Sequence, residues 1–419
     1  MGETTSMKKW TVVGLFWLVQ VFTDIIRVSL AVVAPALMSL YDITPQEMGY
    51  ILSAWNWTYV GFLPFAGPIV DRLGPWIVLG VGSTIWGLAT VALPLAAGVV
   101  SLFLLRALFG FGHSVRYPSQ ATAIARWFHP NQRATAVGLC FSGGQVGLAT
   151  GTLIAALVLD RLGWQWVFYF MGSASLVFTL IWFVFYPEKK IGQQAVPVHE
   201  EKGSEVPRIR WTSLFSHRSV WGIVFGQAGY LYAYFFFVTW LPSYLILERK
   251  MTVLETGLVA SLPFWMGLVG TLTGGWVGDY LIRRGFSRTA SRKTMIGVGL
   301  TLVTITMVAA AFATQTWLAV TLLILCMGSM RLITASANSA PLDLAPVSAV
   351  ASLTSIQNTI GVFSGMLVAI ITGYIVGTTG SFDLALLVAG AMALGGALSY
   401  VFLVKSFEPL PIESAEQPA

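Results

Sequence analysis

Charged side chains inside long apolar stretches are the residues of this sequence best placed to do chemistry. Each such charge costs about 2.5–3.5 kcal/mol at the centre of a membrane helix on insertion scales, so these residues ordinarily face a cavity. Counting from the ends of the stretches puts five near mid-helix: Asp24 and Arg27 in the first stretch, His113 and Arg116 in the fourth, and Arg331 in the tenth. Residues three apart share a helix face. We therefore predict two local pairs, Asp24 with Arg27 and His113 with Arg116.

The composition excludes a water-soluble globule. The 419 residues are 56% hydrophobic and 10% charged, with a mean hydropathy of +0.75, whereas a soluble domain is about a quarter charged. The 42 glycines and 16 tryptophans fit membrane helices, which use glycine at close contacts and tryptophan at lipid headgroups. The net charge of +6 raises the question of nucleic acid, but the topology below accounts for it. No nucleic-acid partner is predicted.

Apolar stretches long enough to cross a bilayer, about 20 residues each, recur along the whole chain. We predict twelve membrane helices, at 10–38, 46–70, 76–98, 101–126, 134–158, 164–186, 219–246, 255–278, 293–314, 317–342, 350–377 and 382–404. The first begins like a signal peptide but continues without a small-residue cleavage site, so we predict that it is retained.

The distribution of lysine and arginine predicts the orientation. Of the 24 such residues, four lie inside helices; if the N-terminus is cytoplasmic, 17 face the cytoplasm and three, Arg161, Arg249 and Lys250, face outward. This bias places both termini in the cytoplasm. The expected location is a cell membrane, the inner membrane if the source is bacterial.

The two halves of the chain repeat one short pattern. The pattern is a glycine, then an aspartate four residues later, then an arginine. It follows the second stretch as Gly67-Pro-Ile-Val-Asp71-Arg72-Leu-Gly74 and the eighth stretch as Gly275-Trp-Val-Gly-Asp279-Tyr-Leu-Ile-Arg283. A polar segment at 187–218 separates the stretches into residues 1–186 and 219–419. We predict an all-α membrane protein of twelve transmembrane helices in two pseudo-symmetric six-helix bundles, joined by a cytoplasmic linker and ending in a short cytoplasmic tail.

Two motifs resemble signatures of the major facilitator superfamily, whose folds are built from such repeats. Residues 67–74 resemble its loop motif between helices two and three, and Arg106-Ala-Leu-Phe-Gly110-Phe-Gly112 resembles its fourth-helix motif. The resemblance implies that Asp71 and Arg72, with Asp279 in the second copy, latch the halves on the cytoplasmic face in one state. It gives Arg106 a structural or gating role. An ordinary charged turn is the alternative for the loop residues.

Within the superfamily, the chain resembles the anion:cation symporters, which include bacterial sugar-acid importers and animal vesicular glutamate and sialic-acid carriers. Four segments carry this resemblance: Arg27-Val-Ser-Leu-Ala-Val, Trp127-Phe-His-Pro-Asn-Gln-Arg133-Ala-Thr-Ala-Val-Gly, Phe237-Val-Thr-Trp-Leu-Pro-Ser-Tyr-Leu245, and Arg283-Arg-Gly-Phe-Ser through Ser291-Arg-Lys293.

The resemblance also implies a central cavity lined by helices one, four, seven and ten. Arg331 falls close to the second-half counterpart of Arg116 when two pairs of residues are aligned, Pro130 with Pro346 and Gln145 with Asn358. The implied cavity then holds three arginines against the single carboxylate of Asp24. A bound anion best satisfies such an excess, because guanidinium groups match carboxylate or phosphate oxygens in bidentate fashion.

We prefer a carboxylate cargo, since the phosphate-ester carriers of the superfamily pair an arginine on helix one with one on helix seven. The seventh stretch is uncharged along its membrane part and offers polar groups for cargo hydroxyls instead: Gln227, Tyr230, Tyr232, Tyr234 and Thr239. Tyr59, Gln145 and Asn358 match polar cavity positions of the symporters. Two symmetry-related arginines favour a dianion, a dicarboxylate or aldarate, over a monocarboxylate.

Each candidate has a structural alternative. Arg27 would form only an ion pair with Asp24, Arg116 would extend toward the cytoplasmic interface, and Arg331 would serve a gate. Tyr59, Gln145 and Asn358 would hold helices together through polar contacts.

The sequence departs from the sugar-acid importers at their proton-coupling acids. Where they typically have an acid before the helix-one arginine this chain has Ile26, and where they have a helix-four glutamate it has His113. An imidazole ordinarily changes charge near neutral pH. Our hypothesis is that His113 carries the proton with Asp24 as its partner.

These features favour a secondary transporter that imports a small organic anion by alternating access with proton symport. The alternative is an exporter of amphipathic drugs or metabolites by proton antiport, which three mid-membrane arginines argue against. No nucleotide-binding glycine loop or catalytic cluster is visible, so we predict neither an enzyme nor a cofactor or metal. The expected partners are the anion, protons and the lipid bilayer, and the expected state is a monomer.

Overall fold

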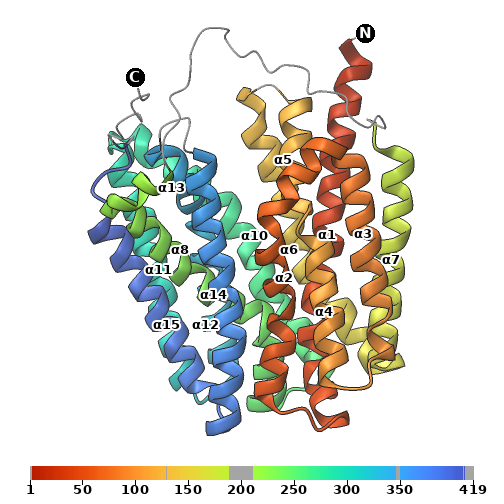
Figure 1. Cartoon of the computed structure of the whole chain (residues 1–419). Helices are drawn as coiled ribbons and strands as arrows, with labels where there is room; N and C mark the ends of the chain where they lie inside the picture. The colour runs from red at the N-terminus through yellow and green to blue at the C-terminus, as the bar shows by residue number, and fades with distance from the viewer. Residues whose placement is uncertain (1, 129, 188–210, 346–349, 409, 411–419) are drawn as a thin grey trace. The chain divides into compact units, whose positions relative to one another are not determined.

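The computed structural model describes residues 2–128, 130–187, 211–345, 350–408 and 410, which are almost entirely helical (Figure 1). The first part of the chain forms α1 (Gly2–Leu40), α2 (Pro45–Leu73), α3 (Pro75–Val91), the 3₁₀ turn η1 (Leu93–Leu95), α4 (Val99–His113), α5 (Arg116–Trp127), α6 (Pro130–Leu162) and α7 (Trp164–Phe185). The second part forms the 3₁₀ turn η2 (Trp211–Ser216), α8 (Arg218–Thr239), α9 (Leu241–Ser243), the π-helix η3 (Tyr244–Glu248), α10 (Val253–Arg283), α11 (Arg288–Phe312), α12 (Thr316–Leu332), α13 (Thr334–Leu344), α14 (Val350–Thr379), α15 (Asp383–Leu398) and the π-helix η5 (Ser399–Leu403).

Each predicted membrane stretch falls on one helix or on one interrupted helix. Ten spans in the described part of the chain are long and apolar enough to cross a membrane, and α3 is a shorter apolar helix. The second predicted stretch corresponds to α2, which is 29 residues long. The predicted all-α architecture is confirmed.

Five predicted stretches are not the single helices that we expected. The third ends as α3 at Val91 before η1, and the twelfth passes from α15 into the π-helix η5. The fourth is broken into α4 and α5, the tenth into α12 and α13, and the seventh ends as α8 at Thr239 before the short elements α9 and η3. Proline explains two breaks, because its ring clashes with the carbonyl four residues earlier. In a continuous helix, the ring of Pro118 would clash with the carbonyl of Ser114 at the α4–α5 break. The ring of Pro242 would clash in the same way with the carbonyl of Val238 at the end of α8.

The repeat between the halves extends beyond the predicted motif into the turns that begin α2 and α10. Asp42 and Lys250 have positive φ angles of 51° and 57°, a conformation uncommon outside glycine. Two residues later Thr44 and Glu47 form a capping box, with reciprocal bonds of 3.2 and 2.8 Å. The capping box of Thr252 and Glu255 has bonds of 3.3 and 2.9 Å. The equivalent residues are 208 positions apart throughout (42 and 250, 44 and 252, 47 and 255), so both halves build this turn in the same way.

The chain divides into two compact units, described separately. One comprises residues 1–200 with 238–261, and the other comprises residues 201–237 with 262–419. In the first unit α1 packs on α6, α2 on α4, and α3 on α7; in the second, α11 packs on α12 and α15. The predicted bundle limits at 186 and 219 stay a prediction, because 188–210 of the linker lie outside the described residues.

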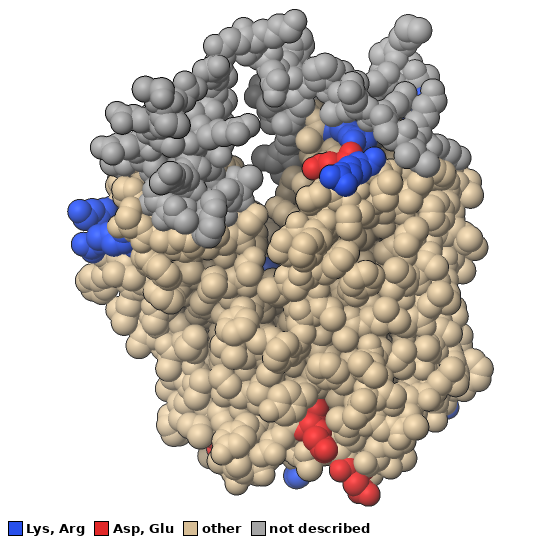
Figure 2. Space-filling model, viewed as in Figure 1, with Lys and Arg blue, Asp and Glu red and all other residues tan. Residues whose placement is uncertain are grey.

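Charge on the visible surface gathers near the ends of the helices. Figure 2 shows lysine, arginine, aspartate and glutamate there, with a broad, largely uncharged belt between. Large apolar side chains are exposed along these helices, among them Leu180 at 66%, Trp276 at 62% and Phe402 at 65%. Such a surface is unstable in water and suits the hydrocarbon of a bilayer.

Candidate functional site

Helix α1 positions the carboxylate and the first arginine. Asp24 is 3% exposed, and its Oδ1 lies 2.8 Å from Nη2 of Arg27, one turn along the same face. Gln20, one turn earlier, donates from Nε2 to the Oδ2 atom of Asp24. The predicted pair of Asp24 and Arg27 is therefore confirmed, and the carboxylate is also held by an amide that the sequence reasoning missed.

The break between α4 and α5 positions the second pair. His113 ends α4 and Arg116 begins α5, and Nε of Arg116 donates to Nε2 of His113 at 3.0 Å. Nη1 of the same guanidinium donates to Oε1 of Gln20 on α1. Arg116 is buried and faces these partners, so it does not extend toward the interface as the structural alternative supposed.

These five residues, Gln20, Asp24, Arg27, His113 and Arg116, form one continuous hydrogen-bonded network, which we name the first cluster. The order of contacts is His113, Arg116, Gln20, Asp24, Arg27. No direct bond joins His113 to Asp24 in this network. The predicted partnership of these two residues therefore runs through Arg116 and Gln20.

Aromatic rings enclose the imidazole of His113. The ring centroids of four side chains lie 5.3–6.1 Å from it, with Phe109 stacked at 18°: Trp55, Tyr59, Trp86 and Phe109. Trp55 also carries Arg27 over its ring, at 5.5 Å. Nδ1 of His113 has no hydrogen-bond partner among the described residues. Tyr59 thus lies against His113, and its role in cargo binding stays a prediction. Trp55 and Trp86 were missed because tryptophan is common in any membrane helix.

The first unit holds more positive than negative charge around this network. Arg106 is 1% exposed, and its guanidinium carbon lies 4.9 Å from the centroid of the Phe109 ring. Its Nε and Nη1 atoms have no hydrogen-bond partner in the described part of the chain. Arg106 therefore lies beside the first cluster, across Phe109, and the region holds three arginines and one carboxylate, an excess for which an anion is the natural partner.

Glycine allows α6 to approach the carboxylate. A methyl group at Gly144 would lie 2.7 Å from Oδ2 of Asp24 and 3.1 Å from Nε2 of Gln20. A side chain at this position would collide with the functional atoms themselves. Gln145, the next residue, is 5% exposed and therefore buried in the first unit.

The second unit holds Arg331 by a different set of contacts. Its Nη1 donates to the hydroxyl of Tyr230 at 3.2 Å, and its guanidinium carbon lies 4.0 Å from the centroid of the Tyr234 ring. The Tyr230 hydroxyl in turn lies 3.1 Å from Oγ1 of Thr334. We name Tyr230, Tyr234, Arg331 and Thr334 the second cluster. Arg331 precedes the α12–α13 break whereas Arg116 follows the α4–α5 break, so the two arginines flank their breaks from opposite sides.

Two further predicted residues lie on helices of the second unit. Gln227 is 2% exposed, and its Oε1 has no partner among the described residues. It lies one turn before Tyr230 on α8, where a methyl group at Gly361 of α14 would come within 3.3 Å of its Cγ. Asn358 is half-buried and lies three residues before Gly361, on the same face of α14.

The predicted gating residues are placed only in part. Asp71 and Arg72 are exposed at the end of α2, and the side chain of Asp279 lies outside the described part of α10. A charged contact that we did not predict joins α11 to α13, where Asp343 lies 3.2 Å from Arg292 and 3.7 Å from Arg288.

Comparison with known proteins decides the family. A model of the Major Facilitator Superfamily matches residues 16–291, about two thirds of the chain. The chain belongs to the major facilitator superfamily. A bacterial homolog of the human lysosomal transporter Spinster has the same fold, with a TM-score of 0.70 at 18% identity over 95% of each chain. The predicted family and the predicted class, a membrane transporter rather than an enzyme, are confirmed.

Curated superfamily members similar to this transporter carry names that refer to sugar acids. The D-galactonate transporter of Escherichia coli O6:H1 is 32% identical over 412 residues, covering 92% of this chain and 94% of that protein. The probable galactarate/D-glucarate transporter GudP of Escherichia coli K12 is 30% identical over 442 residues, covering 98% and 96%. The predicted resemblance to sugar-acid transporters is therefore confirmed.

Proposed function

We propose that this protein imports a small organic anion, a sugar acid or dicarboxylate, by alternating access with proton symport. The observation that carries the proposal is the first cluster, in which two arginines, Arg27 and Arg116, share one carboxylate, that of Asp24. The relatives named for galactonate and for galactarate and glucarate support a sugar-acid cargo.

We propose that Arg27 and Arg116 bind the carboxylate of the cargo. Each guanidinium has five N–H donors in a planar fork that matches the two oxygens of a carboxylate. Polar groups at Tyr59 and Gln145 in the first unit, and at Gln227, Tyr230 and Asn358 in the second, supply partners for cargo hydroxyls. Arg331 provides a second contact for an anion.

We propose that His113 carries the coupled proton. Nε of Arg116 always bears hydrogen, so Nε2 of a neutral His113 is the acceptor and Nδ1 holds the ring proton. A second proton on Nε2 breaks this bond and frees the Arg116 Nε donor for the cargo. Since a bound anion and a bound proton attract each other, each promotes binding of the other.

We propose the roles of the remaining residues by their place in the superfamily motifs. Asp71 and Arg72, with Asp279 in the second half, gate the cytoplasmic side, and Arg106 holds its helix in the gating structure. We propose that the protein acts as a monomer in a cell membrane, the inner membrane if the source is bacterial, with both termini in the cytoplasm.

The decisive experiment replaces His113 with glutamine in protein reconstituted into vesicles. We expect uptake driven by a pH gradient to be lost while counterflow exchange of cargo continues, because exchange needs no net proton movement. His217→Gln, outside the membrane helices, is the matched control and keeps both activities. If His113→Gln responds to a pH gradient as the unaltered protein does, the coupling proposal is wrong.

The cargo is tested separately by thermal shift of the purified protein. Aldonates, aldarates, hexuronates and simple mono- and dicarboxylates are compared at equal concentration. Stabilisation by an aldarate above that by an aldonate supports a dianion. If no anion stabilises the protein, and Arg116→Gln and Arg331→Gln both leave transport intact, the anion proposal fails.

A further inference from the structure

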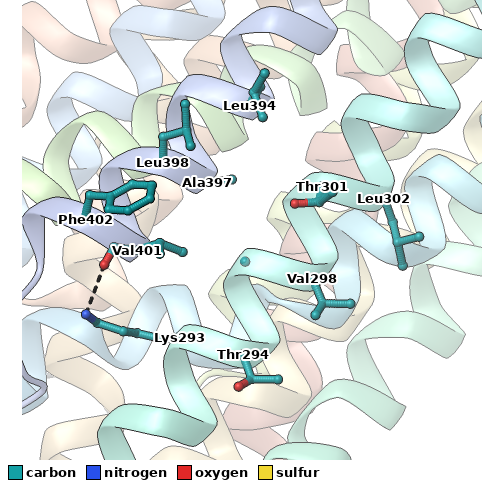
Figure 3. A pocket seen from close by; sticks show the side chains of 11 residues that line it. Lys293, Thr294, Val298, Thr301, Leu302, Leu394, Ala397, Leu398, Val401 and Phe402 are labelled. Atoms are coloured by element: carbon teal, nitrogen blue, oxygen red, sulfur yellow. Dashed lines mark hydrogen bonds between the residues drawn. The ribbon is translucent and has the colours of Figure 1, made fainter.

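An apolar groove with a cation at one end runs between α11 and α15 in the second unit (Figure 3). Its volume is about 440 Å³, within the range of small-molecule sites. The helices that form it run antiparallel, as shown by contacts at both ends. Nζ of Lys293 donates to the carbonyl oxygen of Val401 at 3.0 Å, and Oγ1 of Thr304 donates to the carbonyl oxygen of Gly390 at 3.2 Å.

The walls of the groove suit hydrocarbon. On α11, Val298 and Leu302 are exposed, and on α15 and η5, Leu394, Leu398 and Phe402 are exposed. The lining residues of α11 run from 293 to 302, which corresponds to about 14 Å along a helix at about 1.5 Å per residue. This length and chemistry match part of a lipid acyl chain.

The cationic end of the groove contains several hydrogen-bond donors. Lys293 donates one of its three ammonium hydrogens to the Val401 carbonyl, and the hydroxyl of the neighbouring Thr294 also lines the groove. Arg218, at the start of α8, donates to the carbonyls of Phe402 and Leu403 and so adds a second positive charge at this end. No aspartate or glutamate is among the residues that line the groove.

We propose that this groove is a binding site for an anionic phospholipid, with an acyl chain between α11 and α15 and the phosphate at Lys293. Basic pockets between membrane helices on the cytoplasmic side bind such headgroups in other proteins, and the charge bias of the sequence predicts that this end is cytoplasmic. The lining has no carboxylate to pair with the quaternary ammonium group of a phosphatidylcholine headgroup. The site therefore selects phosphatidylglycerol over phosphatidylcholine.

Lys293 also has a purely structural role available, since it bonds a carbonyl near the end of η5, where cations are favourable. Lys293→Gln separates the two roles, because the glutamine amide still donates to a carbonyl but carries no charge. Lys293→Arg keeps the charge.

The test is native mass spectrometry of the full chain in detergent, titrated with phosphatidylglycerol or phosphatidylcholine. We expect the unaltered protein to bind the first phosphatidylglycerol more tightly than phosphatidylcholine. Lys293→Gln should weaken phosphatidylglycerol binding about fivefold, the factor expected for one lysine at an anionic lipid surface, with Lys293→Arg close to normal. Lys250→Gln, in the turn that precedes α10, is the matched charge control and keeps the preference.

A second variant tests the acyl-chain part of the site. Thr301→Trp fills the groove from an exposed position that lines it and should lower phosphatidylglycerol binding. Ile305→Trp, one turn further along α11 and also exposed, lies outside the lining and should not. The proposal is overturned if Lys293→Gln keeps full binding, if Lys250→Gln loses as much, or if both tryptophan variants bind alike.

Discussion

The two halves of this transporter hold their mid-helix arginines by different means. In the first cluster, Arg27 and Arg116 belong to a network that includes a carboxylate and an imidazole. In the second cluster, Arg331 contacts the hydroxyl of Tyr230 and the ring of Tyr234. Only the first arrangement contains a carboxylate and an imidazole, the two kinds of group able to accept a proton. This difference leads us to propose that proton coupling resides in the first half, and that Arg331 in the second half contacts the anion without taking part in coupling.

The largest effect is expected from Arg116→Gln. Arg116 makes hydrogen bonds to both Gln20 and His113, and bonds made by charged groups contribute about 1.5–3 kcal/mol each. Its loss separates His113 from Asp24, so uptake into vesicles should fall by about 100-fold or more. Arg161→Gln, exposed near the end of α6, removes the same charge and should retain uptake. Normal uptake by Arg116→Gln would remove the first cluster from the mechanism.

A smaller effect is expected from Gly144→Ala. The added methyl group would lie 2.7 Å from the Asp24 carboxylate, and overpacking of this kind costs about 1–3 kcal/mol. Uptake should fall about tenfold, with a lower melting temperature. Gly138→Ala on the same helix meets nothing within 4 Å and is the matched control. Equal uptake by the two variants would show that the position of Asp24 does not limit transport.

The sequence predicted the first cluster where local geometry decides it. The pairs of Asp24 with Arg27 and of His113 with Arg116 follow from residues three apart on one helix face. Gln20 was missed because a neutral amide in an apolar stretch carries no strong signal, and its role depends on how α1 meets the α4–α5 break. One signal was available, since Gln20 lies four residues before Asp24 on the same face.

The fold was predictable in its membrane stretches and less so in its interruptions. Apolar length marks each stretch, and Pro118 and Pro242 mark two breaks by a known steric clash. No proline lies within four residues after the break at Ile333, so nothing in the local sequence indicated it. The contact of Arg331 with Tyr230 and Tyr234 joins α12 to α8, an outcome of tertiary packing that residue spacing along one helix does not reveal.

A more modest effect is expected from Arg331→Gln. This change removes one charged contact that we propose for the cargo, and loss of about 1.4 kcal/mol corresponds to a factor of ten. The KM for the anion should rise about tenfold, while the dependence of uptake on a pH gradient is retained. Loss of pH-driven uptake with exchange preserved, the result expected of His113→Gln, would contradict the difference between the halves.

The smallest effect is expected from Tyr230→Phe, which removes the hydroxyl that accepts from Arg331 and contacts Thr334. A hydrogen bond of this kind contributes about 1 kcal/mol net, so the KM should rise about fivefold. Tyr234→Phe keeps the ring beneath the guanidinium and should leave the KM unchanged. If the Tyr230 hydroxyl acts by orienting Arg331, its removal should have no further effect in an Arg331→Gln background. An undiminished effect in that background would instead indicate that Tyr230 contacts the cargo directly, and the second cluster would then hold two independent binding groups.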